Sequence, residues 1–336
     1  MVEVPNSTLI SVEKSSFLIT GGSGSFGITM VRKLLESGVS FIRVFSRDES
    51  KHHALHNELQ DTRVEFQIGD IRDPESIRYA LRDIDYVFHA AALKHVPASE
   101  VNPFEYAKTN VFGSHNLLTE LSRSKVKSAV FLSTDKAVYP VNAMGMSKAL
   151  MEKLVRSSSY LGGTKSCITR YGNVLGSRGS VIPVFIDSIK RSKPIHITDW
   201  GMTRFIMSLE DSVELVLFAL QNGKQGDLFV QKAPAANLKT ILETLEILLG
   251  KKAPEIHISG IRPGEKIHET LLNVEERTYA EETENFFRVP SVVLERKKNN
   301  PKEYSLSEFR SDSTALLNSR ELLEFLRNDK EISRLI

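Results

Sequence analysis

The sequence predicts an α/β protein in which a doubly wound parallel sheet is accompanied by a smaller, mostly C-terminal lobe. Three observations support this prediction. Short, continuous apolar runs alternate with segments of helical spacing, a glycine-rich turn follows the first apolar run directly, and the alternation weakens beyond residue 172. Continuous apolar runs are typical of strands buried on both faces, and strand–helix repeats imply right-handed crossovers between parallel strands.

The composition narrows the class of protein. The chain has 336 residues, which suggests two domains at roughly 150 residues each. A net charge of +2 gives no electrostatic argument for binding nucleic acid. The single cysteine, Cys167, excludes an intramolecular disulfide and suits a reducing compartment. Because no apolar run reaches the ~18 residues of a membrane span, we expect a cytoplasmic protein without membrane insertion.

The first strand, at residues 17–20, runs into a glycine turn, and helical spacing follows from residue 28 to 35. Such a turn lets backbone amides approach a pyrophosphate, and the helix N-terminus adds partial positive charge. An ordinary glycine-rich turn is the alternative, but the position between a strand and a helix favours a Rossmann-type dinucleotide site. The candidate cofactor-binding residues of this turn are Gly21, Gly24, Ser25, Phe26 and Gly27.

The second strand, at residues 41–45, predicts which nicotinamide cofactor binds. An acidic residue usually ends this strand in NAD-binding proteins, where it binds the ribose 2′-hydroxyl. Here Ser46 and Arg47 follow the strand, and a hydroxyl and a guanidinium suit a 2′-phosphate. We therefore favour NADP, with NAD as the alternative if Asp48 takes the acidic role.

The third strand, at residues 64–68, precedes Asp70 and Ile71, which are candidate cofactor-binding residues. An aspartate there can accept a hydrogen bond from an adenine amino group; capping the next helix is the alternative. His52 and His56 lie four residues apart on the preceding helix. Because no third ligand accompanies them, we expect a solvated helix face and no metal site.

The fourth strand ends in three small residues that allow a ribose or phosphate to approach closely. They are Ala90, Ala91 and Ala92. Lys94 follows in a loop that is expected to overhang the cofactor and to reach the substrate. Asn110, inside a helix expected at about 102–124, is unfavourable locally and is therefore a candidate site residue, although a solvated side chain is the alternative.

The fifth strand, at residues 129–133, delivers the candidate catalytic residues. Thr134, Asp135 and Lys136 follow it directly, and a helix expected from about 144 to 160 carries Met144 and Lys148. Ligands of doubly wound sheets bind beyond the carboxyl ends of the strands. Five of the candidate stretches fall at such ends and are expected to converge on one site, namely Gly21–Gly27, Ser46–Arg47, Asp70, Ala90–Ala92 and Ser133–Lys136.

The C-terminal half supplies the candidate substrate-binding residues. Arginine forks suit phosphate, although a surface ion pair is the alternative for each arginine. The candidates are Lys94, Asn173, Arg178, Arg204, Arg262 and Glu265. The segment 262–266 is expected to be a charged turn and 267–272 a helix.

These patterns divide the chain into four parts. Residues 1–15 lack periodicity and are expected to form an N-terminal arm. Residues 16–172 are expected to form the NADP-binding Rossmann domain, to which the C-terminal half adds later strands. Residues 173–295 are expected to form a substrate-binding lobe interleaved with the sheet, and residues 296–336 a charged C-terminal tail.

With these motifs the chain resembles the extended short-chain dehydrogenase/reductases over roughly residues 15 to 290. Within them it is most similar to nucleotide-sugar 4,6-dehydratases that act on UDP-N-acetylglucosamine, of the CapE-like type that serves capsule and O-antigen synthesis. The motifs that carry the resemblance are Thr20–Gly27, Ser46–Asp48, Ala90–Pro97, Ser133–Ala137, Met144–Lys148, Arg170–Val174, Thr203–Phe205 and Arg262–Lys266.

One position departs from the superfamily. Most members have Tyr-x-x-x-Lys, in which the tyrosine phenolate is the base for the sugar 4-hydroxyl. Met144 stands at the tyrosine position and cannot carry a proton. The CapE-like subgroup is similar in having methionine there, so the resemblance implies activity by another proton path. A water, Lys148, or the Asp135–Lys136 pair are the alternatives.

The resemblance implies a reaction in which hydride leaves sugar C4, water is lost across C5 and C6, and hydride returns to C6 with inversion at C5. Lys136, with a pKa depressed by neighbouring positive charge, is expected to be the base at C5. Asp135, if burial raises its pKa, is expected to protonate the C6 hydroxyl. Thr134 is expected to bond near O4, and Lys148 to hold the nicotinamide ribose.

Two other functions remain open at this point. A UDP-hexose C4-epimerase needs the same fold and oxidation but no acid–base pair for C5 and C6, so Asp135 and Lys136 favour dehydration. A non-catalytic NADP-binding sensor or scaffold is suggested by the missing tyrosine. We also expect a homo-oligomer, dimer-based and up to a hexamer, paired through the helices at 102–124 and 144–160, with a UDP-sugar as the small-molecule partner.

Overall fold

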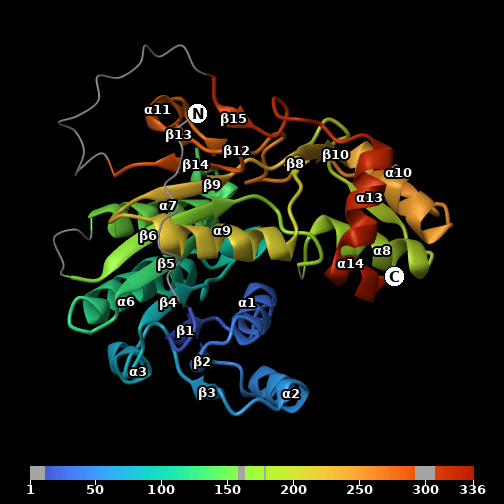
Figure 1. Cartoon of the computed structure of the whole chain (residues 1–336). Helices are drawn as coiled ribbons and strands as arrows, with labels where there is room; N and C mark the ends of the chain where they lie inside the picture. The colour runs from blue at the N-terminus through green and yellow to red at the C-terminus, as the bar shows by residue number, and fades with distance from the viewer. Residues whose placement is uncertain (1–11, 158–162, 178, 292–306) are drawn as a thin grey trace.

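The computed structural model describes residues 12–157, 163–177, 179–291 and 307–336. Within these residues nine strands form one central sheet, in the order β13-β14-β9-β6-β5-β4-β1-β2-β3 (Figure 1). Strands β1 to β6 and β9 are parallel, whereas β14 and β13 are antiparallel to their neighbours. The predicted doubly wound α/β fold is confirmed.

The order of the strands places the topological switch between β1 and β4, because the chain runs outward through β2 and β3 and then returns to the other side of β1. Ligands of doubly wound sheets bind beside such a switch point. The bounds of the sheet strands are β1 Ser16–Thr20, β2 Phe41–Ser46, β3 Val64–Ile68, β4 Tyr86–His89, β5 Ser128–Thr134, β6 Lys165–Tyr171, β9 Leu228–Gln231, β13 Glu281–Glu282 and β14 Phe286–Val289.

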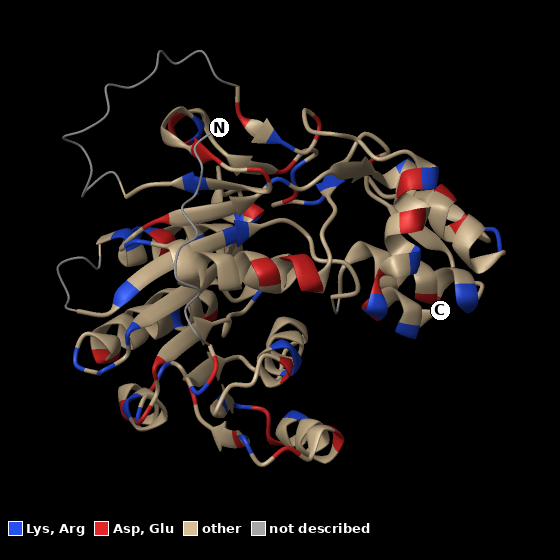
Figure 2. Ribbon diagram, viewed as in Figure 1, with Lys and Arg blue, Asp and Glu red and all other residues tan. Residues whose placement is uncertain are grey.

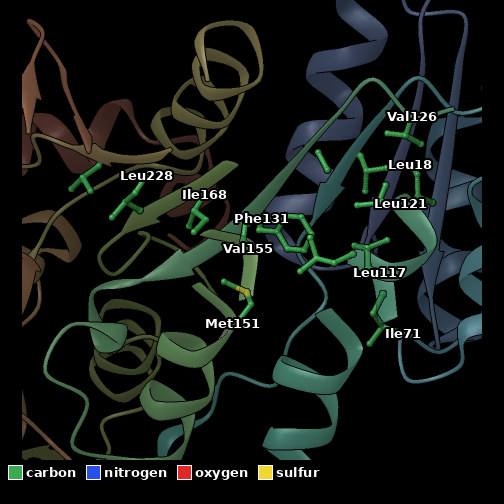
Figure 3. Packing of buried hydrophobic residues seen from close by; sticks show 14 of the residues in the cluster. Leu18, Ile71, Leu117, Leu121, Val126, Phe131, Met151, Val155, Ile168 and Leu228 are labelled. Carbon is green, nitrogen blue, oxygen red and sulfur yellow. The ribbon is translucent and has the colours of Figure 1, made fainter. Parts of the chain in front are cut away.

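Helices cover both faces of the sheet because the central strands are apolar on both sides. Phe17 and Ile19 of β1 belong to a core shared with α1 and α9, whereas Leu18 belongs to a core shared with α3, α6 and α7. Figure 3 shows the core that contains Leu18, along which Phe131, Met151 and Ile168 also lie. The helices that make these layers are α1 Ser25–Glu36, α2 Glu49–Leu59, α3 Pro74–Ala80, α6 Gly113–Leu121, α7 Ala143–Ser157 and α9 Leu209–Asn222.

The helix expected at 102–124 is interrupted in the structure. The segments α4 (Val96–Val101) and α5 (Pro103–Tyr106) precede a π-helical turn, η1 (Ala107–Phe112), which leads into α6. Several apolar side chains on these segments and on α7 are exposed, namely Val101, Phe104, Phe112, Met146 and Leu150. Pairing of subunits through these helices stays a prediction.

The C-terminal half builds a second core apart from the sheet. Its members come from α8 (Val181–Lys190), β7 (Ile195–Ile197), α10 (Leu238–Leu249), α13 (Ser319–Asn328) and α14 (Lys330–Leu335). Figure 1 shows these helices grouped on one side of the sheet. The remaining elements are η2 Asp135–Ala137, β8 Thr203–Phe205, β10 Ala235–Asn237, β11 Ile256–Ile258, β12 Thr270–Leu272, α11 Val274–Tyr279 and β15 Phe309–Arg310.

Two expectations about the C-terminal half differ from the structure. The segment expected as a helix at 267–272 contains strand β12, because it pairs with β15, which lies far along the chain. The segment expected as a charged tail contains α13 and α14, whose apolar faces pack into the C-terminal core through Leu322, Leu326 and Ile332. The N-terminal arm falls mostly outside the described residues.

The burial of α13 predicts a stability effect that a tail would not show. Leu322 is fully buried, so Leu322→Ala should lower the free energy of unfolding by about 2–4 kcal/mol through lost burial and a residual cavity. Leu316→Ala is the control, since that side chain is 49% exposed and its loss should change stability by less than about 0.5 kcal/mol. Urea denaturation measures both, and equal midpoints would contradict the packing of α13.

Candidate active site

The turn between β1 and α1 is shaped to bring backbone close to a ligand. Gly21 has φ +68°, and a Cβ added there would lie 2.8 Å from the Ala91 nitrogen and 2.9 Å from the Ala90 carbonyl. A Cβ at Gly27 would lie 2.4 Å from the backbone of Gly22. Glycine at these positions therefore lets the ends of β1 and β4 and the start of α1 approach one another.

The start of α1 is free to bind an anion. Gly24 is the N-cap and offers no side-chain hydrogen bond, so the amides of Ser25, Phe26 and Gly27 are not capped by it. Unsatisfied amides at a helix N-terminus and the positive end of the helix dipole suit a pyrophosphate. The residues present therefore fit a dinucleotide at this turn.

The end of β2 is organised by Ser46. Its hydroxyl lies 2.8 Å from the Ser23 hydroxyl and 2.7 Å from Nε2 of His52. His52 is buried, so the expectation that it belongs to a solvated face is wrong, although His56 is exposed as expected. Among the described residues no group of three potential ligands is placed to hold a metal ion.

Arg47 and Asp70 face each other at this edge, with 3.7 Å between Nη1 and Oδ2. Asp70 is also held by the guanidinium of Arg72, at 2.6 to 3.0 Å. Burial raises the pKa of Asp70, but the hydrogen bonds from Arg72 outweigh it and leave the pKa lowered. Ile71 is buried in the core against Gly113. Arg72 is a partner of Asp70 that the sequence analysis did not anticipate.

The loop after β4 is fixed by a buried amide. Asn110 accepts a hydrogen bond from the Leu93 N–H and donates to the Leu93 carbonyl, both at 2.9 Å. It also donates to the Ser147 hydroxyl on α7 at 2.9 Å. Because Asn110 is buried, the alternative of a solvated side chain is wrong; it ties the Ala90–Lys94 loop to α7. Lys94 itself is exposed.

A buried histidine that the sequence analysis missed lies beneath this loop. Nδ1 of His89 is 2.7 Å from the Thr20 hydroxyl and Nε2 is 2.9 Å from the Ser114 hydroxyl. Burial, and then the charge of Lys148, lower its pKa to about 3. His89 is therefore a neutral link between β1, β4 and α6.

The fifth strand ends in a buried acid–base cluster. Asp135 is fully buried, and its Oδ1 accepts hydrogen bonds from the Thr134 hydroxyl at 2.8 Å and from Nζ of Lys136 at 3.0 Å. Nζ of Lys136 also donates to Oδ1 of Asn173 at 3.2 Å and lies 3.4 Å from Oε1 of Glu269. The structure thus brings together four predicted site residues and one, Glu269, that was not predicted.

The expected depression of the Lys136 pKa is wrong. Burial lowers the pKa of Lys136, but the carboxylates of Asp135 and Glu269 outweigh burial and the opposing charge of Arg204, so the pKa is raised. Lys136 is therefore held as an ammonium ion. The expectation omitted Glu269, whose carboxylate reaches Lys136 from a segment distant in sequence.

Lys148 and Met144 lie on one buried face of α7, one turn apart. Nζ of Lys148 donates to the Leu132 carbonyl at 2.6 Å, and burial lowers the pKa of Lys148 to about 8. The start of α7 touches the corner formed by residues Thr134–Lys136 directly, since a Cβ at Gly145 would lie 2.3 Å from the Lys136 carbonyl oxygen. The side chain of Met144 supplies no proton donor there.

A buried network of ion pairs lies next to residues Thr134–Lys136 and is joined to Ser133 of β5. The guanidinium of Arg170 pairs with Glu152 and Glu276 and donates to the Leu271 carbonyl at 2.8 Å. Glu152 accepts from the Ser133 hydroxyl at 2.5 Å. Although burial opposes it, the two carboxylates raise the pKa of Arg170. The network connects β5, α7, β6 and β12, and a cavity of about 690 Å³ lies beside it, between α7 and α11.

The remaining substrate candidates lie at the lobe side of the corner. The guanidinium of Arg204 donates to the carbonyls of Ile267 and Lys266, at 3.0 and 3.2 Å. Arg262 is half exposed, with 3.9 Å between its Nη1 and Oε1 of Glu265. Arg178 lies outside the described residues. Figure 2 shows that acidic and basic residues are interspersed over the ribbons. Among the described helices, none is both long enough and apolar enough to span a bilayer.

The fold and the glycine turn define a dinucleotide-binding protein of the extended short-chain dehydrogenase/reductase class, and the comparisons with known proteins place it among the nucleotide-sugar-modifying enzymes of that class. The chain belongs to the family of polysaccharide biosynthesis proteins, whose model matches residues 17–291. Among its relatives is the UDP-glucose 4-epimerase of Rickettsia felis, 44% identical over 329 residues that cover 93% of this chain and 95% of that protein. The UDP-glucose 4-epimerase of Rickettsia conorii is 45% identical over 327 residues, with the same coverage.

Solved structures agree with this family. Pen from Bacillus thuringiensis has a TM-score of 0.88 and 35% identity, over 97% of this chain and 99% of that one. The dTDP-glucose 4,6-dehydratase DesIV from Streptomyces venezuelae, solved with NAD and TYD bound, has a TM-score of 0.69 at 23% identity, covering 75% of this chain and 86% of that one. At that identity the second likeness concerns the fold alone.

The geometry of the glycine turn predicts a binding effect. Gly21→Ala should reduce dinucleotide affinity by about tenfold or more, because the new methyl group would press on the Ala90–Ala91 backbone at a positive φ. Gly250→Ala is the matched control: its φ is +60°, but nothing lies within 4 Å, so it bears the backbone strain without the contact. Fluorescence titration with NADPH and NADH measures affinity, and unchanged binding by Gly21→Ala would place the dinucleotide elsewhere.

Proposed function

We propose that the protein is a UDP-N-acetylglucosamine 4,6-dehydratase that inverts C5. It would produce a UDP-2-acetamido-2,6-dideoxy-hexos-4-ulose for bacterial surface polysaccharide synthesis, such as capsule or O-antigen. The observation that carries this proposal is the ion pair between buried Asp135 and partly buried Lys136, which lies just beyond the carboxyl end of β5. A reaction confined to C4 needs no such pair.

A bound nicotinamide would supply hydride chemistry, accepting hydride from C4 and returning it at C6. Elimination between C5 and C6 then needs one group to remove the C5 proton and another to protonate the departing hydroxyl. Asp135 and Lys136 share one dissociable proton. The residue that carries this proton acts as the acid, and the other acts as the base. Since the pKa of Lys136 is raised, we assign the acid to Lys136 and the base to Asp135, the reverse of the roles expected from the sequence.

Neighbouring residues orient this pair. The Thr134 hydroxyl donates to Asp135 and accepts from the Lys136 backbone N–H at 3.4 Å, which leaves one lone pair of its oxygen available to a sugar hydroxyl. Met144 occupies the position of the usual tyrosine, so proton transfer at the sugar 4-hydroxyl must use a water, Lys148 or the pair itself. Lys148, with a pKa of about 8, is placed one turn from Met144 and would hold the nicotinamide ribose. Lys94, Asn173, Arg178, Arg204, Arg262 and Glu265 are the proposed contacts to the UDP-sugar.

A UDP-hexose C4-epimerase is the second candidate, because the Rickettsia relatives bear that name at 44–45% identity. The two reactions share oxidation at C4 and differ in their later steps. A non-catalytic NADP-binding sensor is the third candidate, since Met144 replaces the tyrosine that most of the superfamily uses.

Product analysis in heavy water distinguishes these functions. With UDP-N-acetylglucosamine, a dehydratase should yield a product that has lost one water and gained deuterium at C5, which mass spectrometry detects; NMR reports the C5 configuration. Lys136→Ala should lose about 10²–10⁴-fold in rate, as expected for removal of an acid–base group. Lys239→Ala, on the exposed face of α10, is the control. A product of the same mass as the substrate but with the other configuration at C4 would support the epimerase. Recovery of unaltered substrate would support the sensor.

We also propose that the cofactor is NADP. Asp48, the alternative ligand for a ribose 2′-hydroxyl, instead caps α2 by accepting from the Lys51 amide at 3.0 Å. Arg47 is half exposed, and its ion pair with Asp70 is long, so its guanidinium is available to a 2′-phosphate.

Comparing the two cofactors in titrations checks this preference. Wild type should bind NADPH more tightly than NADH, and Arg47→Ala should lose about tenfold or more in NADPH affinity while leaving NADH affinity unchanged, because charge-assisted hydrogen bonds to the phosphate are lost. Arg82→Ala, an exposed arginine that stacks on Tyr79, is the control. Tighter NADH binding by wild type would overturn the NADP proposal.

A further inference from the structure

Lys136 has a third neighbour that the proposed reaction leaves without a role. Glu269 is buried, and its Oε1 lies 3.4 Å from Nζ of Lys136. Within the described residues its other oxygen, Oε2, is buried without a hydrogen-bond partner. A buried carboxylate is costly unless it is paired, so its position beside an ammonium ion needs an explanation.

The backbone around Glu269 is held on both sides. Its N–H donates to the Ser311 hydroxyl and its carbonyl accepts from the Ser311 N–H, both at 2.9 Å. Arg204 holds the carbonyl of Ile267 before it, and Arg170 the carbonyl of Leu271 after it. Glu269 is therefore placed by Ser311, which follows β15, together with Arg204 of β8 and Arg170 of β6.

Nζ of Lys136 donates hydrogen bonds to Asp135 and Asn173 and forms an ion pair with Glu269. An ammonium ion has three N–H groups, and the oxygens of Asp135, Asn173 and Glu269 lie at 3.0, 3.2 and 3.4 Å from Nζ. Two of these acceptors are charged and one is neutral. Without Glu269, Lys136 would lose one of its two ion pairs. Among the described residues, Asp135 would then be the remaining carboxylate in contact with Lys136.

Arg204 and Lys266 bring further positive charge near this cluster, whereas Arg170 is itself paired with Glu152 and Glu276. Arg204 acts against the charge of Lys136, and Lys266, which donates to the Val138 carbonyl, feels both carboxylates as well as Lys136 and Arg170. With Asp135 as the single carboxylate, the positive groups would outnumber it. Glu269 is thus the charge that offsets this excess.

We propose that Glu269 is a positioning residue of the acid–base pair, which holds the ammonium of Lys136 in place and keeps the proton on it, so that Lys136 is the acid and Asp135 the base. This inference rests on the proposed dehydratase function. The direction of the Lys136 pKa agrees with it: burial alone would lower that pKa, and Glu269 is one of the two carboxylates that reverse the effect.

The test replaces Glu269 by its neutral isostere. If Lys136 must be protonated to act, the dehydration rate falls as the pH rises through the Lys136 pKa. Glu269→Gln removes one negative charge at 3.4 Å and should shift this falling limb to lower pH by on the order of one unit or more. Glu269→Asp keeps the charge and should restore at least part of the shift. Glu275→Gln, which neutralises an exposed carboxylate on α11, should leave the profile unchanged.

A second measurement does not depend on catalysis. Selective labelling of lysine Nζ with ¹⁵N allows the Lys136 signal to be assigned by its loss in Lys136→Arg and then titrated by NMR. In Glu269→Gln this signal should titrate at lower pH than in wild type, and Glu269→Asp provides the same comparison if the glutamine variant does not fold.

The outcomes separate the inference from the proposed function. If wild type does not dehydrate the substrate but the Lys136 signal shifts in Glu269→Gln, the function fails while the pairing of Glu269 with Lys136 stands. If dehydration occurs and both the pH profile and the NMR titration of Glu269→Gln superimpose on wild type, the inference is overturned. A rate that falls without any shift of the limb also overturns it, because it would indicate a purely structural role.

Discussion

The site depends on one interaction, the ammonium of Lys136 held between buried carboxylates. A buried ion pair offsets the cost of desolvation only when its geometry is good and its remaining donors are satisfied. Here the acceptors come from three places: the 3₁₀ turn after β5, the loop after β6, and the segment before β12. The Thr134–Lys136 corner is therefore complete only when the sheet and the C-terminal segment are assembled together, which explains why so many contacts converge on residues 264–272.

Those contacts share one design. In each of them a cationic or amide side chain donates a hydrogen bond to a backbone carbonyl of the segment. The donors are Asn142 to the carbonyl of Gly264, Arg204 to those of Lys266 and Ile267, and Arg170 to that of Leu271. Lys266 in turn reaches back to the Val138 carbonyl. Hydrogen bonds from charged donors are stronger than neutral ones, and each of these fixes the register of the segment against β5, β6 and α7. Glu269 is carried by this segment, so its distance from Lys136 is set by the backbone around it.

The sequence predicted those parts of the site that depend on local pattern. Buried strands are recognisable as apolar runs, and the rule that ligands lie beyond the carboxyl ends of parallel strands brings Gly21, Ser46 and the Thr134–Lys136 corner together without further information. Glu269 could not be found this way, because its proximity to Lys136 depends on pairing between β12 and β15, which no local spacing encodes. The same pairing explains why 267–272, a short stretch of mixed polarity that suits either helix or strand, was assigned wrongly.

The C-terminal helices are a different case, since their signal was present in the sequence. Asn318 and Glu321 form a capping box at the start of α13, and Leu322 and Leu326 follow four residues apart. High charge in the surrounding residues obscured this pattern. His52 was misjudged for a similar reason, because a histidine on a polar helix gives no local sign that Ser46 and Phe66 will enclose it.

The rigidity of the corner bears on the choice between epimerase and dehydratase. Both reactions begin with oxidation at C4, but an epimerase must then present the other face of the ketone to the cofactor, whereas a dehydratase must keep C5 and C6 beside its acid and base. In this chain the proposed acid, Lys136, donates hydrogen bonds to Asp135 and Asn173 and pairs with Glu269, and α7 packs so closely on the corner that a methyl group at Gly145 would meet the Lys136 carbonyl at 2.3 Å. A charged corner that is fixed on every side suits a ring that is held still while a proton is removed and water departs, and this physical argument favours dehydration despite the name borne by the Rickettsia relatives.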